Sequence, residues 1–288
     1  MAPAGFGFTL QPDLEFLRLT RRIVEEYADF YELTPEAFWA RDFRRTHQHG
    51  IVREIVARSG RPCVGHGVGY SVGAPERTER HDRWLAELRL EMRDFGFAWY
   101  SEHLGFTEHE GLQATLPLPL PPTREAVRAV AARMKELATL TPVVAFENNV
   151  AYVRAGDPLA EPEFFGAICA EAGCWLLLDL HNAYTQCLNF GVDLDRYLDR
   201  LDLARVLEIH VSGGSESEPG WLRSGRAYRL DTHDGPVPEP VWQALERLLP
   251  RCPGLRGVVL ERLPLGLDAA KVVALEAECK RAKELLGC

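Results

Sequence analysis

The seven cysteines of this 288-residue chain include no C-x-x-C pair and follow no regular spacing. An odd and unpatterned set of cysteines argues against a disulfide framework. It is typical of reduced thiols in a cytoplasmic protein, where most of them fill the core. We therefore expect a cytoplasmic location and no stabilising disulfides.

The chain also lacks a net positive charge, and it has no long apolar run. The chain carries 33 Lys and Arg against 42 Asp and Glu, a formal charge of −9. This balance argues against nucleic acid as the main partner, because phosphate binding requires a basic surface. No apolar run approaches the roughly 18 residues that suffice to span a membrane. Residues 1–12 have neither a basic start nor a long apolar segment, so no export signal is expected.

No glycine-rich phosphate-binding motif follows the first predicted strand, which disfavours a doubly wound nucleotide-binding sheet. The chain instead alternates between two kinds of segment. Apolar or glycine-rich segments predict strands at residues 5–10, 28–33, 61–66, 97–101, 142–146, 174–182, 205–209 and 257–260. Apolar residues at helical spacing, or helix-forming composition, predict helices at 12–27, 51–59, 79–95, 127–137, 162–172, 193–201, 241–248 and 272–286. Eight such pairs predict an α/β fold, a (β/α)8 TIM barrel, in a single domain over 1–288 with a long polar loop at about 212–230.

The sixth predicted strand has an apolar run that ends in a carboxylate, an imidazole and a carboxamide, Asp179, His181 and Asn182. Taken alone, an Asp and an Asn at a strand end are equally well explained by a turn. The pattern recurs, however, at strands three to eight or directly after them. The residues of metal-ligand type there are His66, His103, Glu147, Asp179, Asn182, His210, Asp231, His233 and Glu261.

Strand ends of a parallel barrel point to one rim, where active sites are built. A single histidine at a strand end is usually only hydrogen-bonded, but this many donors at one rim predict a metal site. Imidazoles with carboxylates suit zinc, manganese or non-haem iron, whereas magnesium prefers oxygen donors alone. The set is large enough for two or three ions, which Glu147 and Glu261 could bridge. Such ions clamp a phosphate, activate a water or bind dioxygen, and residue types alone do not choose between these.

The long loop at 212–230 contains Trp221, Arg223 and Arg226. A loop of this length in a compact domain is usually a lid or a binding loop. Arginines with an aromatic residue suit a peptide or an anionic substrate, so these three residues are candidates for substrate binding.

Other polar residues carry weaker signals. His47 and His49 are expected in a loop after the second strand, solvated or in contact with substrate. His81 is expected at the surface of a helix. Glu32 and Glu36 could line the barrel mouth.

Several motifs resemble those of a known family. They are His66-Gly67, Ser101-Glu102-His103-Leu104, Glu147-Asn148, the stretch 177–182, Ile209-His210, Asp231-Thr232-His233 and Leu260-Glu261. Together, and in this order, they resemble the multinuclear non-haem iron-dependent oxidative enzymes, which include the catalytic subunit of methanobactin biosynthesis. The resemblance runs from the first strand to the last, and the motifs are specific only as a set. Glu147-Asn148 is followed here by Asn149 and Val150, where the family pattern leads us to expect proline or serine.

The resemblance implies a barrel that holds two or three iron ions and uses dioxygen to modify cysteine residues of a ribosomally made precursor peptide. It also implies a small partner protein that recognises the leader of that peptide. Carried over by position, the nine residues of metal-ligand type become the iron ligands. His181 matches the family ligands less well than Asn182 does, so it is a candidate for substrate binding or for supporting a ligand.

Three alternatives remain open at this level. A sugar isomerase or an endonuclease-type phosphodiesterase would use metal ions on the same barrel without dioxygen. A non-catalytic metal-binding scaffold would show substituted ligand positions, and none of the nine is substituted.

Overall fold

Eight parallel strands close into a barrel in the order β1-β10-β9-β8-β7-β4-β3-β2. This computed structural model describes residues 4–109, 112–153, 156–221, 223 and 225–287. The barrel strands are β1 (Gly5–Thr9), β2 (Phe30–Leu33), β3 (Cys63–Gly67), β4 (Tyr100–His103), β7 (Val144–Glu147), β8 (Trp175–Asp179), β9 (Val206–Val211) and β10 (Gly257–Leu260). The predicted (β/α)8 TIM barrel is therefore confirmed.

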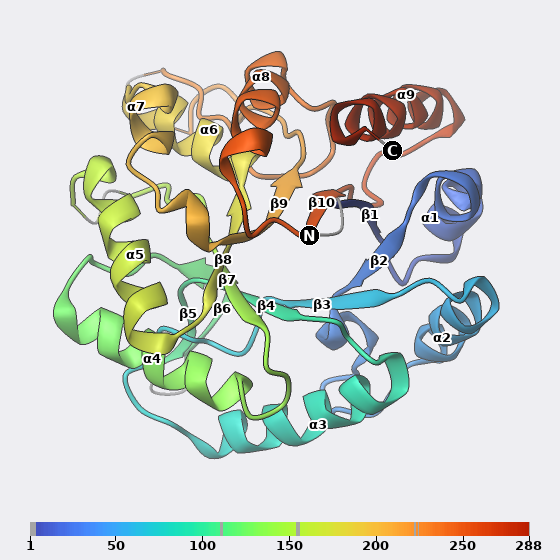
Figure 1. The fold of residues 1–288 in the computed structure, drawn as a ribbon, viewed down its shortest axis with the longest axis horizontal. Coiled ribbons are helices and arrows are strands. Elements are labelled where there is room, and N and C mark those ends of the chain that lie inside the picture. Colours follow the sequence, from blue (N-terminus) through green and yellow to red (C-terminus); the bar gives the residue numbers. More distant parts are fainter. Residues whose placement is uncertain (1–3, 110–111, 154–155, 222, 224, 288) are drawn as a thin grey trace.

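Helices surround the barrel on all sides (Figure 1). They are α1 (Leu14–Leu19), α2 (His47–Ser59), α3 (Glu79–Phe95), α4 (Arg124–Leu137), α5 (Glu161–Ala172), α6 (Leu180–Phe190), α7 (Leu194–Leu198), α8 (Glu239–Leu248) and α9 (Ala269–Leu286). Between α1 and β2 the chain forms a π-helical turn, Ile23–Tyr27, where one continuous helix over 12–27 was expected. Within the described residues, no helix is both long and apolar enough to cross a membrane. The cysteines that the structure describes are buried and form no disulfide with one another.

Strand residues alternate between two apolar clusters. Those that face the helices join one large core, which includes Tyr31, Cys63 and Leu178. Those that face inward form a small plug inside the barrel: Phe30, Val64, Trp99, Ala145, Leu177, Leu207 and Val259. Because side chains alternate along a strand, the residues two positions further toward the carboxyl ends also face inward. This second inward layer is polar.

A β-bulge in β9 decides which of its side chains belong to this polar layer. Leu176 of β8 pairs with Val206, but the next residue, Leu177, pairs with Glu208. Leu207 is thus an extra residue on β9, and a bulge of this kind reverses the alternation beyond it. As a result both Glu208 and His210 face the interior, above Leu207 of the plug.

The sixth predicted strand was extended too far, since β8 ends at Asp179 and α6 begins at Leu180. The Asp179 side chain accepts a hydrogen bond from the Asn182 backbone N–H at 2.6 Å and so caps the helix. The junction between strand and helix brings Asp179, His181 and Asn182 to one end of the barrel. The sequence prediction missed α6 because its first residues had been assigned to the strand.

Two further segments differ from expectation. α2 begins at His47, so His47 and His49 lie in a helix and not in a loop. His49 is buried and lies 2.9 Å from a Glu91 carboxylate oxygen, which is a structural contact. A hairpin, β5 (Phe106–His109) with β6 (Leu112–Leu118), follows β4 and was not predicted.

The expected surface position of His81 is wrong. His81 is buried at the start of α3, where its Nδ1 lies 2.9 Å from the hydroxyl of the N-cap residue Thr78.

Candidate metal centre

Most of the residues predicted as metal ligands meet at the carboxyl end of the barrel. Strand ends supply most of them, the first turn of α6 supplies Asn182, and the segment after β9 supplies Asp231 and His233. They form three neighbouring groups that share carboxylates.

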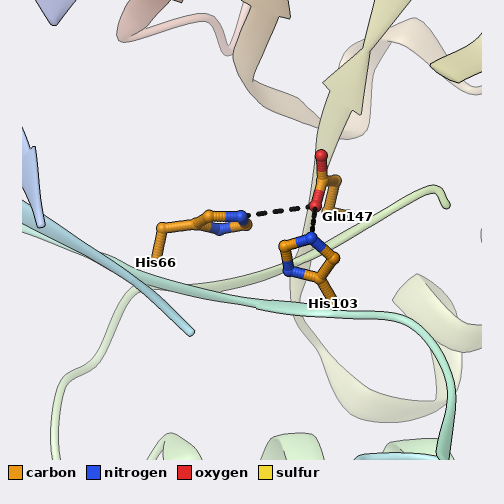
Figure 2. A group of neighbouring side chains, drawn as sticks. All are labelled: His66, His103 and Glu147. Carbon is orange, nitrogen blue, oxygen red and sulfur yellow. Dashed lines mark ion pairs between the residues drawn. The ribbon is translucent and has the colours of Figure 1, made fainter. Parts of the chain in front are cut away.

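The first group consists of His66, His103 and Glu147 (Figure 2). Both imidazole Nε2 atoms face the same carboxylate oxygen of Glu147, at 3.3 Å from His66 and 3.0 Å from His103. The outer nitrogens are hydrogen-bonded: Nδ1 of His66 lies 2.8 Å from the Ser101 hydroxyl, and Nδ1 of His103 lies 3.0 Å from the Gly67 carbonyl. Partners of this kind orient an imidazole so that its other nitrogen faces a metal ion.

The second group adds His210, Asp179 and Glu261 to the same Glu147. The Nδ1 atom of His210 lies 3.3 Å from Glu261 Oε2 and 3.8 Å from Glu147 Oε1. One ligand atom from each of the four residues lies within 4.8 Å of the others. Glu147 therefore belongs to two groups, as a bridging carboxylate would.

The third group is built around His233. Its Nδ1 lies 3.1 Å from Glu261 Oε2 and its Nε2 lies 2.6 Å from Asp231 Oδ1. His233 has a φ of 50°, in the left-handed region that costs energy for a residue with a Cβ. Its carbonyl accepts hydrogen bonds from the Arg262 guanidinium at 2.8 Å and the Leu263 N–H at 3.0 Å, which stabilise this conformation.

Asn182 contacts the first two groups through Glu147. Its amide nitrogen donates to the Asn148 carbonyl at 3.0 Å and lies 3.4 Å from Glu147 Oε1. Asn148 in turn forms two hydrogen bonds with the backbone of Asp179, at 3.0 and 2.9 Å. The Glu147-Asn148 pair thus ties the end of β7 to the end of β8.

Several buried atoms of these groups lack hydrogen-bond partners among the described residues. They are His66 Nε2, Glu147 Oε2, Asp179 Oδ2, Asn182 Oδ1, His210 Nδ1 and His233 Nδ1. Buried polar atoms almost always have a partner, so a convergent set without one calls for a ligand. Imidazole nitrogens and carboxylate oxygens that converge on shared positions fit divalent cations, and this donor set suits zinc, manganese or iron.

The charges of the site support the same interpretation. Burial raises the pKa of Asp179 well above its ordinary value, and the charge of Glu147 adds to that effect. Burial opposes the charged form of His103, but the Glu147 carboxylate outweighs it and raises the pKa to about 10. Burial likewise disfavours the ionised Glu147, yet the charges of His103 and His66 lower its pKa to about 2. These two shifts favour the charged forms of His103 and Glu147, and metal ions replace the protons of such imidazoles when they bind.

The predicted substrate residues lie in different surroundings. His181 is fully buried: its Nε2 accepts a hydrogen bond from the Arg229 side chain at 3.2 Å, and its Nδ1 lies 3.4 Å from Asp231 Oδ1. Both ring nitrogens are thereby engaged, which makes His181 a support for Asp231. Arg226 donates a hydrogen bond to the Leu188 carbonyl at 3.0 Å and so anchors its loop to α6.

Three members of the predicted substrate set, Trp221, Arg223 and Arg226, are exposed. The Trp221 side chain is 63% exposed, and Arg223 is exposed as well.

Two buried glutamates beside the centre are not among the predicted ligands. Glu32 and Glu208 are both fully buried inside the barrel, beneath His210. Glu36 accepts hydrogen bonds from the backbone N–H groups of Val68 and Gly69, directly after β3, and so supports that loop. Inward alternation along β2 could have identified Glu32, but the bulge that turns Glu208 inward leaves no signal in the sequence.

Comparison with solved structures finds the same fold in other proteins. A D-psicose 3-epimerase solved with D-fructose aligns over 99% of this chain and 100% of its own, with a TM-score of 0.61 at 10% identity. Endonuclease IV from Thermus thermophilus aligns over 96% and 99%, with a TM-score of 0.54 at 17% identity. At such low identity the likeness shows the fold alone.

Sequence relatives are much closer. A UPF0276 protein of Rhizorhabdus wittichii is 37% identical over 219 residues, which cover 76% of this chain and 73% of the relative. A UPF0276 protein of Caulobacter vibrioides is 35% identical over 246 residues, covering 84% and 81%. The family model described as "RiPP precursor modification enzyme MbnB/TglH/ChrH" matches residues 4–287. A RiPP is a ribosomally made peptide that is modified after translation, so the resemblance inferred from the motifs is confirmed and this chain belongs to the MbnB/TglH/ChrH family of RiPP precursor modification enzymes.

Proposed function

We propose that this protein binds two or three iron ions at the carboxyl end of the barrel and uses dioxygen to oxidise cysteine residues of a ribosomally made precursor peptide. Membership of a family of peptide-modifying enzymes supports the substrate class. The observation that carries the proposal is the convergence of buried, unpartnered imidazole and carboxylate atoms on shared positions.

The three groups define where ions would be held. His66, His103 and Glu147 would hold one ion; Glu147, Asp179, His210 and Glu261 would hold a second. Glu261 and Nδ1 of His233 would hold a third ion, Asp231 would act from the Nε2 side of the same imidazole, and Asn182 would add its free amide oxygen beside Glu147. When bound, iron ions supply a site for a thiolate and for the activation of dioxygen. Shared carboxylates offset the repulsion between neighbouring cations.

Access to the site is one-sided. The side chains of His66, Glu147 and His210 are at most 2% exposed, whereas those of His103 and Asp231 are 20% and 21% exposed. A peptide would therefore approach over His103 and Asp231, while the barrel interior excludes water from the opposite side. Exposed Trp221 and Arg223 would contact peptide outside the centre, and a small partner protein would recognise the leader.

The test is anaerobic purification and loading with ferrous iron, followed by incubation with a cysteine-containing precursor peptide, its partner protein and dioxygen. We expect two to three iron ions per chain, consumption of dioxygen and a mass change confined to a cysteine of the peptide. Zinc-loaded protein is the control and should be inactive.

Activity of the zinc-loaded enzyme would refute the oxidative proposal. Turnover of a sugar or a phosphodiester without dioxygen would instead identify one of the metal-dependent alternatives. Uptake of ions with no turnover of any of these substrates would favour a scaffold.

A further inference from the structure

Beneath the candidate metal centre, two fully buried glutamates from different strands approach the same histidine. Glu32 of β2 lies with Oε2 at 2.9 Å from His210 Nε2. Its other oxygen, Oε1, accepts a hydrogen bond from the Thr9 hydroxyl at 3.2 Å. Glu32 is therefore held at both oxygens by protein groups.

Glu208 has a different partner. Its Oε2 accepts a hydrogen bond from the indole N–H of Trp99 at 2.7 Å. Its Oε1 lies 3.9 Å from His210 Nε2, which is beyond hydrogen-bond distance. Two carboxylates thus lie in one buried layer, and only Glu32 is hydrogen-bonded to the imidazole.

His210 also differs from the two histidines of the first group. His66 and His103 turn Nε2 toward Glu147 and bond their Nδ1 atoms to a hydroxyl and a carbonyl. His210 is reversed: its Nε2 meets a carboxylate, and its Nδ1 faces Glu261 and Glu147. An N–H on Nε2 that donates to Glu32 leaves the Nδ1 lone pair facing the second group.

We propose that Glu32 is a positioning residue for His210: it holds the tautomer that presents Nδ1 to the ion shared by Glu147, Asp179 and Glu261. A carboxylate partner also makes an imidazole a stronger electron donor than a hydroxyl or carbonyl partner does. His210 is then a stronger imidazole donor than His66 or His103, and Glu32 tunes the electronic properties of the ion that His210 would contact. This inference rests on the proposed metal-dependent function.

The test compares Glu32→Gln with Glu208→Gln in the full chain. Both changes keep the size of a fully buried side chain in the same layer and remove one negative charge. We expect Glu32→Gln to weaken binding of one ion by about 10- to 100-fold, the usual effect of losing such a partner. Chelator competition with ferrous iron measures the affinity. The visible absorption bands of the cobalt-loaded protein report the ligand field and should shift in Glu32→Gln but not in Glu208→Gln.

A second variant guards against poor folding of Glu32→Gln. Thr9→Val removes the hydroxyl that holds Glu32 Oε1 and should give a smaller change in the same direction. Unfolding temperatures of the metal-free proteins provide the check on folding.

The possible results separate the two proposals. Wild-type protein that takes up no iron or cobalt would refute the proposed function. Normal uptake by wild type with unchanged affinity and spectrum in Glu32→Gln would overturn the role of Glu32 alone. An equal loss of metal affinity in Glu208→Gln would also overturn it. The effect would then follow from removing any negative charge from the barrel interior.

Discussion

At the scale of single residues, the centre is a chain of alternating imidazoles and carboxylates. Glu147 contacts His66 and His103 on one side and lies near His210 on the other. Glu261 lies between His210 and His233 in the same way. Each shared carboxylate belongs to two candidate ion positions, so single substitutions should have unequal effects.

Replacing Glu147 with Gln should remove more than one iron ion per chain, because its oxygens belong to both the first and the second group. Asp231→Asn is the matched comparison and should affect only the ion near His233. Iron and protein content after anaerobic loading measure both. Loss of the same amount of iron in the two variants would contradict the sharing of Glu147.

Trp221→Ala should weaken binding of the precursor peptide without changing the iron content. The side chain is 63% exposed, so its removal leaves the core intact. Loss of an exposed aromatic anchor costs on the order of 1–2 kcal/mol of binding free energy, roughly 5- to 30-fold in Kd. Calorimetric titration of iron-loaded protein with the peptide gives the affinity, and Leu265→Ala, at another exposed apolar residue, is the control. An unchanged Kd would remove Trp221 from the peptide-binding surface.

At the scale of elements, Glu161 joins three helices. It is the first residue of α5, it contacts Gln186 of α6, and it accepts a hydrogen bond from the Tyr197 hydroxyl of α7 at 3.2 Å. Burial outweighs these hydrogen bonds and raises the pKa of Glu161 from 4.5 to about 7. The junction of the three helices therefore binds a proton that the unfolded chain does not bind at mildly acidic pH.

This proton makes stability depend on pH with a defined sign. The folded state binds more protons between about pH 4.5 and 7, so its free energy of unfolding falls as pH rises through that window. At 1.36 kcal/mol per pKa unit, Glu161 lowers the free energy of unfolding by on the order of 3 kcal/mol between the two ends of this window. Glu161→Gln should remove this part of the decline, whereas Glu163→Gln, whose side chain is 69% exposed, should not. Urea unfolding at several pH values gives the comparison, and parallel profiles for wild type and Glu161→Gln would contradict the raised pKa.

At the scale of the whole molecule, one closed barrel surrounded by helices leaves no boundary at which half of the chain could unfold alone. We propose that residues 1–288 form a single domain, which should unfold in one cooperative transition. The candidate ligands come from strands around most of the barrel, so bound ions would link β3, β4, β7, β8, β9 and β10.

Metal binding should therefore stabilise the entire fold. An ion present at 100 times its Kd adds about 2.7 kcal/mol to the free energy of unfolding. For a chain of this size that is a rise of roughly 5–10 °C in Tm. Calorimetry of iron-loaded protein before and after chelation measures the change, with Glu147→Gln as the variant that should respond less. An unchanged Tm, or two transitions that respond separately, would contradict this account.

The sequence by itself determined the barrel and the types of residue at its carboxyl rim. Alternating strand and helix patterns are local, and so is the position of His66, His103, Glu147 or Glu261 at or just beyond the end of a strand. Given parallel strands, these local facts are enough to place the residues at one end. Whether each of the nine residues binds a metal ion stays a prediction.

Only the tertiary structure decided how those residues are paired. Glu32 and His210 are 178 positions apart, and His181 and Asp231 are 50 apart, so no local pattern links them. The bulge at Leu207 turns His210 inward, and the cap formed by Asp179 places Asn182 beside Glu147. Such contacts depend on how strands are aligned across the barrel. Packing of the whole chain sets that alignment, so it cannot be predicted from the order of residues within one segment.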